Sequence, residues 1–140
     1  EFESSLKEVV LAKRLSASKM ESLTEVALKL TDQDAKLLSV LFHTHMNIPA
    51  SSKVSSLYVF DSICRAARRQ TIKHNLTTDG DKGNAATFLL KTQRILEGLF
   101  QDIIASNPSE GKEKAKKVLD IWSKGNTFPL FVLTRLKELV

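Results

Sequence analysis

The chain of 140 residues contains one cysteine, one tryptophan and one tyrosine. A single thiol, Cys64, excludes an internal disulfide framework and suits a reducing compartment. No apolar run approaches the roughly 18 residues that a membrane-spanning helix needs, and no secretory leader is recognisable. Val and Ile seldom cluster, and the period-two alternation of strands is missing, so we expect no β-sheet.

The residues that are present are typical of a folded globular protein, with 42% hydrophobic and 26% charged. A chain of this length can bury about 70% of its unfolded surface. We therefore expect residues 1–140 to form a single, monomeric domain excised from a longer protein. Lys and Arg number 21 against 16 Asp and Glu, giving a net charge of +5. This excess favours a polyanionic partner such as nucleic acid, anionic lipid or a phosphorylated peptide.

Helical periodicity is nearly continuous and is interrupted by turn residues. It predicts seven or so helices, over about 1–13, 18–30, 32–46, 51–73, 85–106, 109–125 and 129–140. A capping box from Ser18 to Glu21 begins the second helix, and Gly125 ends the sixth. The polar stretch 74–84 is expected to be a mobile loop. The fold class is therefore all-α, either a bundle or a right-handed helical stack.

The segment from Leu57 onward carries two different faces of one helix. Residues of the first face recur at core spacing: Leu57, Phe60, Ile63, Cys64 and Ala67. The second face is polar: Tyr58, Asp61, Ser62, Arg65 and Arg69. This face suits a shallow peptide-binding groove, because it sets a ring, a carboxylate, a hydroxyl and guanidinium groups side by side. The alternative is an ordinary amphipathic helix with a charged outer face.

The start of the second helix is the best candidate for an anion site. Ser16 and Ser18 offer hydroxyls beside free backbone N–H groups, where the helix dipole favours negative charge. Lys13 and Arg14 precede these serines and Lys19 follows them. The alternative is a plain helix cap without a further role.

Near the end of the sixth helix, Val118 and Ile121 could form an apolar wall beside Lys124, as a groove for proline-containing peptides needs. The alternative assigns Ile121 and Trp122 to the core. His43 and His45 point apart on a helix and no acid or cysteine completes a metal site. No nucleophile–base arrangement and no cofactor fingerprint is visible, so we expect neither an enzyme nor a cofactor.

Two motifs together resemble the CTD-interacting domain, which binds the C-terminal heptad repeats of the largest RNA polymerase II subunit. They are Ser56-Leu57-Tyr58-Val59-Phe60-Asp61-Ser62-Ile63 and Val118-Leu119-Asp120-Ile121-Trp122, the latter followed by Lys124-Gly125. Asn126-Thr127-Phe128-Pro129 is most similar to RNA-binding termination factors and SR-related CTD-associated factors. The resemblance implies a right-handed superhelix of seven to eight helices, similar to ENTH and VHS domains. It also implies a nuclear protein of transcription termination or RNA 3′-end processing.

The resemblance further implies roles for single residues. Tyr58 would pack against a proline of the repeat, and Asp61 would accept the hydroxyl of its tyrosine. Val118 and Ile121 would form the apolar wall, while Arg65 and Lys124 correspond to groove-side arginines. Ser16 and Lys19 match positions where some relatives hold a phosphoserine. Two residues depart from this pattern: Lys19 replaces an arginine, and Ala12 stands where some members have a lysine.

Two other classes of function remain open at this stage. A helical RNA- or DNA-binding domain would use the basic residues directly, but one Tyr and one Trp offer a thin stacking surface. RNA could also be bound by other parts of the full-length protein. A membrane-trafficking adaptor of the ENTH or VHS kind would share the superhelix, but the chain shows no basic amphipathic leader, and we expect no membrane partner.

Overall fold

The structure, a computed structural model, describes all 140 residues and consists of α-helices and two short 3₁₀ helices. The all-α prediction is confirmed. The α-helices are α1 (Phe2–Leu11), α2 (Ala17–Lys29), α3 (Asp34–Met46), α4 (Lys53–Lys73), α5 (Ala85–Gln93), α6 (Leu96–Ser106), α7 (Pro108–Gly125) and α8 (Leu130–Leu139). The 3₁₀ helices are η1 (Thr31–Gln33) and η2 (Ala50–Ser52). None of the helices is long and apolar enough to span a membrane.

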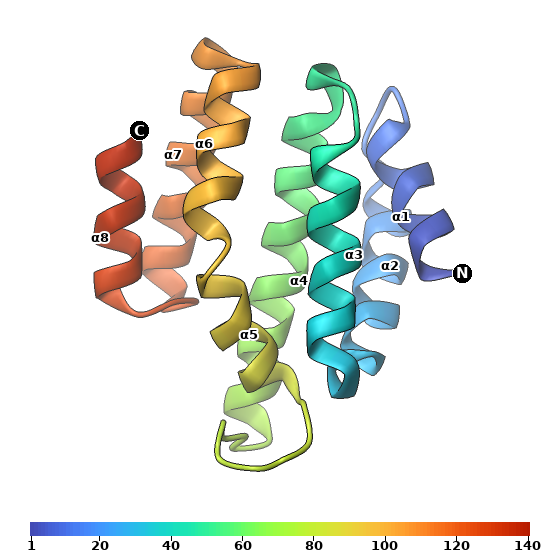
Figure 1. Cartoon of the computed structure of the whole chain (residues 1–140), viewed down its shortest axis with the longest axis vertical. Helices are drawn as coiled ribbons and strands as arrows, with labels where there is room; N and C mark the ends of the chain where they lie inside the picture. The colour runs from blue at the N-terminus through green and yellow to red at the C-terminus, as the bar shows by residue number, and fades with distance from the viewer.

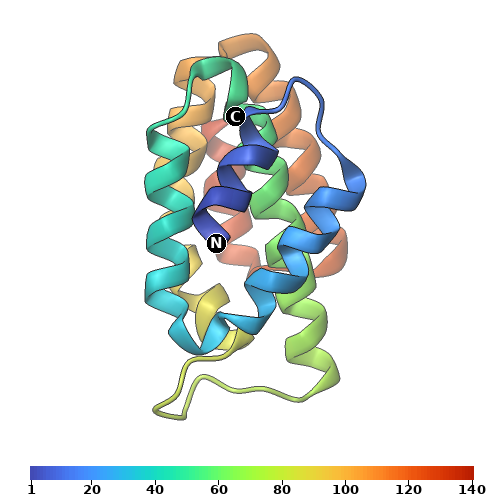
Figure 2. The ribbon, with the colours of Figure 1, turned by 90° about the vertical axis from the view of Figure 1, so that its right-hand side faces the viewer.

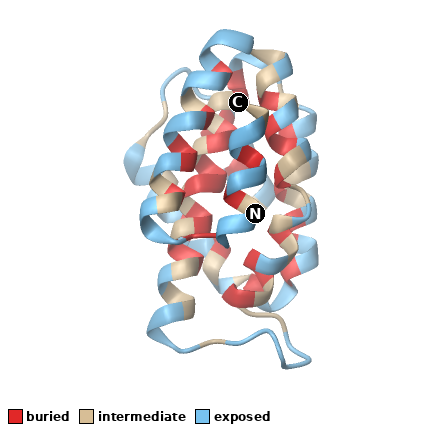
Figure 3. Ribbon diagram, turned by 90° about the vertical axis from the view of Figure 1, so that its left-hand side faces the viewer, coloured by how far each residue is buried: buried red, intermediate tan, exposed pale blue.

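Helix α4 is the centre of the molecule and packs against α1, α2, α3, α5, α6 and α7. The amino-terminal helices lie on one side of α4, and α7 and α8 lie on the other (Figure 1). Buried residues face this central layer and exposed residues cover the outer faces of the helices (Figure 3). The core is one continuous cluster of 28 buried hydrophobic residues.

The core face predicted for α4 is confirmed. Leu57, Ile63, Cys64 and Ala67 are fully buried and Phe60 is 1% exposed. Burial raises the pKa of the Cys64 thiol, with a further contribution from the Asp61 carboxylate, so this sulfur stays protonated and serves packing.

The predicted long helix over 85–106 is wrong, because the chain breaks between α5 and α6. The backbone N–H groups of Arg94 and Ile95 donate three residues back, to the carbonyls of Lys91 and Thr92, at 3.1 and 3.0 Å. These tightened turns redirect the chain. Leu96, Leu99, Phe100 and Ile103 can then bury against α7. Burial of this second apolar stripe outweighs the loss of one continuous helix.

Helix ends also differ from the sequence predictions. Ser16, not Ser18, caps α2, where its hydroxyl accepts a hydrogen bond from the Lys19 N–H at 3.3 Å. The left-handed residue after α7 is Asn126, at φ 52°, while Gly125 is the last helical residue. Asn can adopt this conformation because its short side chain tolerates the left-handed region.

A buried polar network joins α3, α4 and α6. The ring of His45, which is fully buried, lies 2.8 Å from the Ser56 hydroxyl and 2.9 Å from the Asp102 carboxylate. Lys53 Nζ lies 2.9 Å from Asp102 and donates to the His45 carbonyl at 2.6 Å. Burial, assisted by the Lys53 charge and opposed by Asp102, lowers the pKa of His45 to about 4. The imidazole is therefore neutral at pH 7.

Two helical glycines give a matched test of packing. A Cβ at Gly111 would lie 2.7 Å from the Ile103 carbonyl oxygen, whereas a Cβ at Gly98 would meet nothing within 4 Å. We expect Gly111→Ala to lower the free energy of unfolding by about 1–3 kcal/mol through overpacking. Gly98→Ala should raise it by about 0.5–1 kcal/mol through helix propensity. Urea unfolding measures both, and equal signs would contradict the close α6–α7 packing.

Candidate peptide-binding groove

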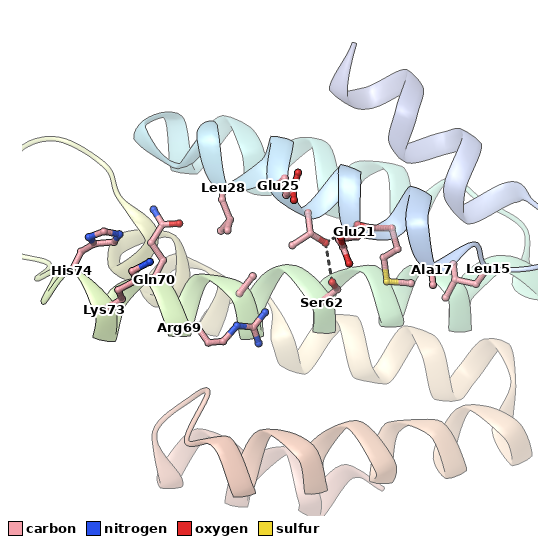
Figure 4. A pocket seen from close by; sticks show the side chains of 13 residues that line it. Leu15, Ala17, Glu21, Glu25, Leu28, Ser62, Arg69, Gln70, Lys73 and His74 are labelled. Carbon is pink, nitrogen blue, oxygen red and sulfur yellow. Dashed lines mark hydrogen bonds between the residues drawn. The ribbon is translucent and has the colours of Figure 1, made fainter.

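An open groove of about 800 Å³ lies between α2 and α4. It is lined by Leu15, Ala17, Met20, Glu21, Thr24, Glu25, Leu28, Ser62, Ala66, Arg69, Gln70, Lys73 and His74. Leu15 and Ala17 lie at one end and Lys73 and His74 at the other (Figure 4). The groove therefore begins at the predicted anion site and follows α4 to its carboxyl end.

The two walls of the groove differ in charge. Glu21 and Glu25 belong to α2, and Arg69 and Lys73 to α4. None of these four side chains takes part in an ion pair. The charges are therefore free to meet a charged ligand. Arg69 belongs to the polar face predicted for α4. Lys73 and the two glutamates were not predicted, because nothing in the local pattern shows that α2 faces α4.

Ser62 lies in the groove, as the polar face of α4 predicted. Its hydroxyl is 2.8 Å from the Thr24 hydroxyl, so the two helices are joined at the floor (Figure 4). Thr24 also donates to the carbonyl of Met20 at 2.8 Å. A ligand that lies across α2 and α4 would rest on this hydroxyl pair.

Asp61, which the sequence places on the polar face of α4, is only 5% exposed. Trp122 Nε1 donates to Asp61 Oδ1 at 2.8 Å, and Arg65 donates to both carboxylate oxygens at 2.9 Å. The indole is fully buried and packs against Phe128 and Phe100, with ring centroids 4.9 and 5.8 Å away. Asp61 thus joins α4 to α7 through one buried acceptor.

The remaining predicted peptide contacts are divided between core and surface. Val118 is 1% exposed, so the expectation that it forms a surface wall is wrong: α7 turns this side chain into the core. Tyr58 and Ile121 are half-buried and pack against the core. Lys124 is exposed and pairs with Asp120 at 3.1 Å.

The predicted anion site at the start of α2 is on the surface. Lys13, Arg14, Ser18 and Lys19 are exposed and Ser16 is half-buried. The two serine hydroxyls lie 3.2 Å apart. Lys19 Nζ pairs with Glu8 at 3.2 Å, and both side chains are well exposed, so this pair holds the lysine only weakly.

The model of one protein family, the CID domain, matches residues 1–136. This chain belongs to the CID family. Similar full-length proteins include the Rpb7-binding protein seb1 of Schizosaccharomyces pombe, 28% identical, and the human SR-related and CTD-associated factor 4, 27% identical. Each match covers 89% of this chain but only 20% and 10% of those proteins. The chain thus spans a fifth or less of their length.

Solved CID structures agree with this one over almost its whole length. The yeast Nrd1 CID in complex with Sen1 NIM3 superposes with a TM-score of 0.87 at 28% identity, covering 98% of this chain and 94% of that one. The CTD-interacting domain of Seb1 from S. pombe gives 0.87 at 27% identity, covering 98% and 91%. The all-α superhelix expected from the resemblance is thereby confirmed.

Proposed function

We propose that this CID binds phosphorylated heptad repeats of the RNA polymerase II largest-subunit tail. The observation that carries the proposal is the family match over 1–136, because the solved relatives are CTD-interacting domains of Seb1 and Nrd1. The groove between α2 and α4 supports it. The distance from Ser62 to Lys73 along α4 is about 16 Å at 1.5 Å per residue, which accommodates about five residues of extended peptide.

The contacts we propose to the repeat lie around α4 and α7. The Tyr58 ring packs against a proline, and Ile121 offers the exposed part of an apolar wall that Val118 supports from behind. Asp61 Oδ2 accepts one hydrogen bond within the protein, from Arg65, which leaves it capacity for a tyrosine hydroxyl of the ligand. Ser62 and Lys124 complete the peptide contacts.

We propose that a phosphate of the repeat binds at the amino terminus of α2. Ser16 and Ser18 would supply hydroxyl and backbone donors, and Lys13, Arg14 and Lys19 would supply charge. A phosphate carries about −1.5 to −2 charges and three acceptor oxygens, which suits this set of donors. Lys19 would exchange Glu8 for the phosphate at little cost because their pair is exposed.

The proposed ligand is disordered before it binds, so ordering it keeps the affinity for one repeat modest, at about micromolar or weaker. Many copies of the repeat on one polymerase raise the effective concentration. Weak single contacts and a repeated ligand thus suit an adaptor domain. We infer that the chain acts without enzymatic activity, in the nucleus, by recruiting a termination or 3′-end-processing factor.

Titration calorimetry with a two-repeat peptide tests this function. We expect the phosphorylated peptide to bind more tightly than the unmodified one, and raised salt to weaken the phosphorylated complex more. Equal affinities would defeat the phosphate part of the proposal. Absence of binding to both peptides would defeat the whole proposal.

Lys19→Glu tests the phosphate position. The variant replaces attraction by repulsion, so we expect it to weaken binding of the phosphorylated repeat by about tenfold. It should leave the unmodified peptide almost unchanged. Lys137→Glu is the matched control: it changes the net charge equally, but it lies on α8, away from the groove. Similar losses in both variants would mean that overall charge, and not a local site, decides the preference.

A further inference from the structure

Helix α3 leaves part of its apolar side-chain surface outside the core. One face, with Leu37 and Leu41, is buried in the core. The adjacent face lines a separate groove through Ala35, Leu38, Ser39, Phe42, His43 and Met46. Leu38 is 8% exposed and belongs to the core, Phe42 is half-buried, and Ser39 and His43 are polar. Met46 is 46% exposed. Leu38, Phe42 and Met46 follow one another at four-residue spacing, so apolar surface remains at the floor of this groove toward the end of α3.

The second wall of this groove comes from the break between α5 and α6, through Lys91, Arg94 and Ile95. The groove has a volume of about 680 Å³. It shares no lining residue with the groove between α2 and α4. In Figure 2, α3, α5 and α6 lie on the left, and the upper part of α2 lies on the right. A ligand here would therefore not compete for the groove between α2 and α4.

The charge of this second groove has one sign. No Asp or Glu is among its nine lining residues, which include Lys91 and Arg94. Lys91 is already paired with Asp34 at 2.7 Å. Arg94 is exposed and forms no ion pair. Arg94 is thus the unneutralised cation at the rim of an apolar floor.

We propose that the groove between α3 and the α5–α6 break binds an acidic amphipathic helix of a partner protein. From Ala35 to Met46 the floor is about 16 Å long, which matches about three turns of helix. An all-α surface offers no strand edge to an extended peptide, whereas a helix satisfies its own backbone hydrogen bonds. Apolar side chains of the partner fill the space over Leu38, Phe42 and Ile95, and a carboxylate pairs with Arg94.

The probe is a fluorescein-labelled 15-residue helical peptide with leucines on one face and glutamates flanking them. The control peptide has lysine in place of each glutamate. Anisotropy should detect binding of the glutamate peptide and weaker binding of the lysine peptide. Arg94→Glu should weaken the glutamate peptide roughly fivefold and strengthen the lysine peptide. Met46→Glu, which puts a charge on the exposed part of the floor, should weaken the glutamate peptide about tenfold or more.

The phosphorylated repeat provides an independent reference. Its affinity should be the same in wild type, Arg94→Glu and Met46→Glu, so failure of this inference and failure of the proposed function are distinguishable. The inference is overturned if neither peptide binds, if both bind equally, or if NMR shift changes map to α2 and α4. Sedimentation showing that the domain dimerises through Met46 would also overturn it, since a second copy would then cover the groove.

Discussion

Asp61→Ala should lower the free energy of unfolding by about 3 kcal/mol, because it removes the acceptor of a buried indole N–H and the partner of Arg65. Trp122 is fully buried, so water cannot replace the lost acceptor without opening the contact between α4 and α7. Arg65 is 41% exposed at its side chain and recovers part of its solvation. Thermal unfolding should shift downward by about 10 °C for a domain of this size.

Asp61→Asn separates the structural role of Asp61 from its proposed binding role. The amide oxygen can still accept from Trp122, so we expect about half of the destabilisation and a folded domain at 25 °C. If Asp61 accepts the tyrosine hydroxyl of the repeat, Asp61→Asn and a peptide with phenylalanine for tyrosine should show non-additive losses of affinity. Wild-type stability of Asp61→Ala would contradict the structural role, and additive losses would contradict the binding role.

Acid should weaken the fold through His45. Its folded pKa is about 4 and the unfolded value is about 6.5, so the unfolded chain binds the extra proton. Stability from the neutral imidazole is therefore complete above about pH 6.5 and is lost as the pH falls from about 6.5 toward about 4. The loss amounts to about 3 kcal/mol by linkage. Urea unfolding at a series of pH values measures it.

His45→Gln is the control for this pH dependence. The glutamine has no proton to gain, so the difference in unfolding free energy between wild type and variant should change with pH over the same window. Other groups also respond to acid. Burial raises the pKa of Asp34, but hydrogen bonds, led by that of Lys91, outweigh it and lower this pKa. The contribution of such a group is the same in both proteins and cancels in the difference. A difference that stays constant from pH 7.5 to 4.5 would show that His45 takes no part.

Asp61 shows what the local sequence pattern can predict and what it cannot. Its spacing from Tyr58 correctly places both residues on α4, but periodicity cannot tell that a tryptophan 61 residues away donates to it. The burial of Val118 could not be predicted for the same reason. The packing of α7 against α4 decides which part of an apolar helix face lies at the surface. No proline or glycine at Arg94–Ile95 indicates the break between α5 and α6. The chain breaks there because the apolar residues of α5 pack mainly against α3 and α4, whereas those of α6 pack mainly against α7 and α8.

The residue order by itself determined the helical class, the core face of α4, the basic charge and the family, since periodicity, composition and short motifs are properties of near neighbours. Only the tertiary structure decided that α2 and α4 enclose a groove, that Asp61 is an internal acceptor, and that α3 and the α5–α6 break enclose a second groove. These features depend on contacts between residues far apart in the chain, whose geometry follows from how the whole core packs.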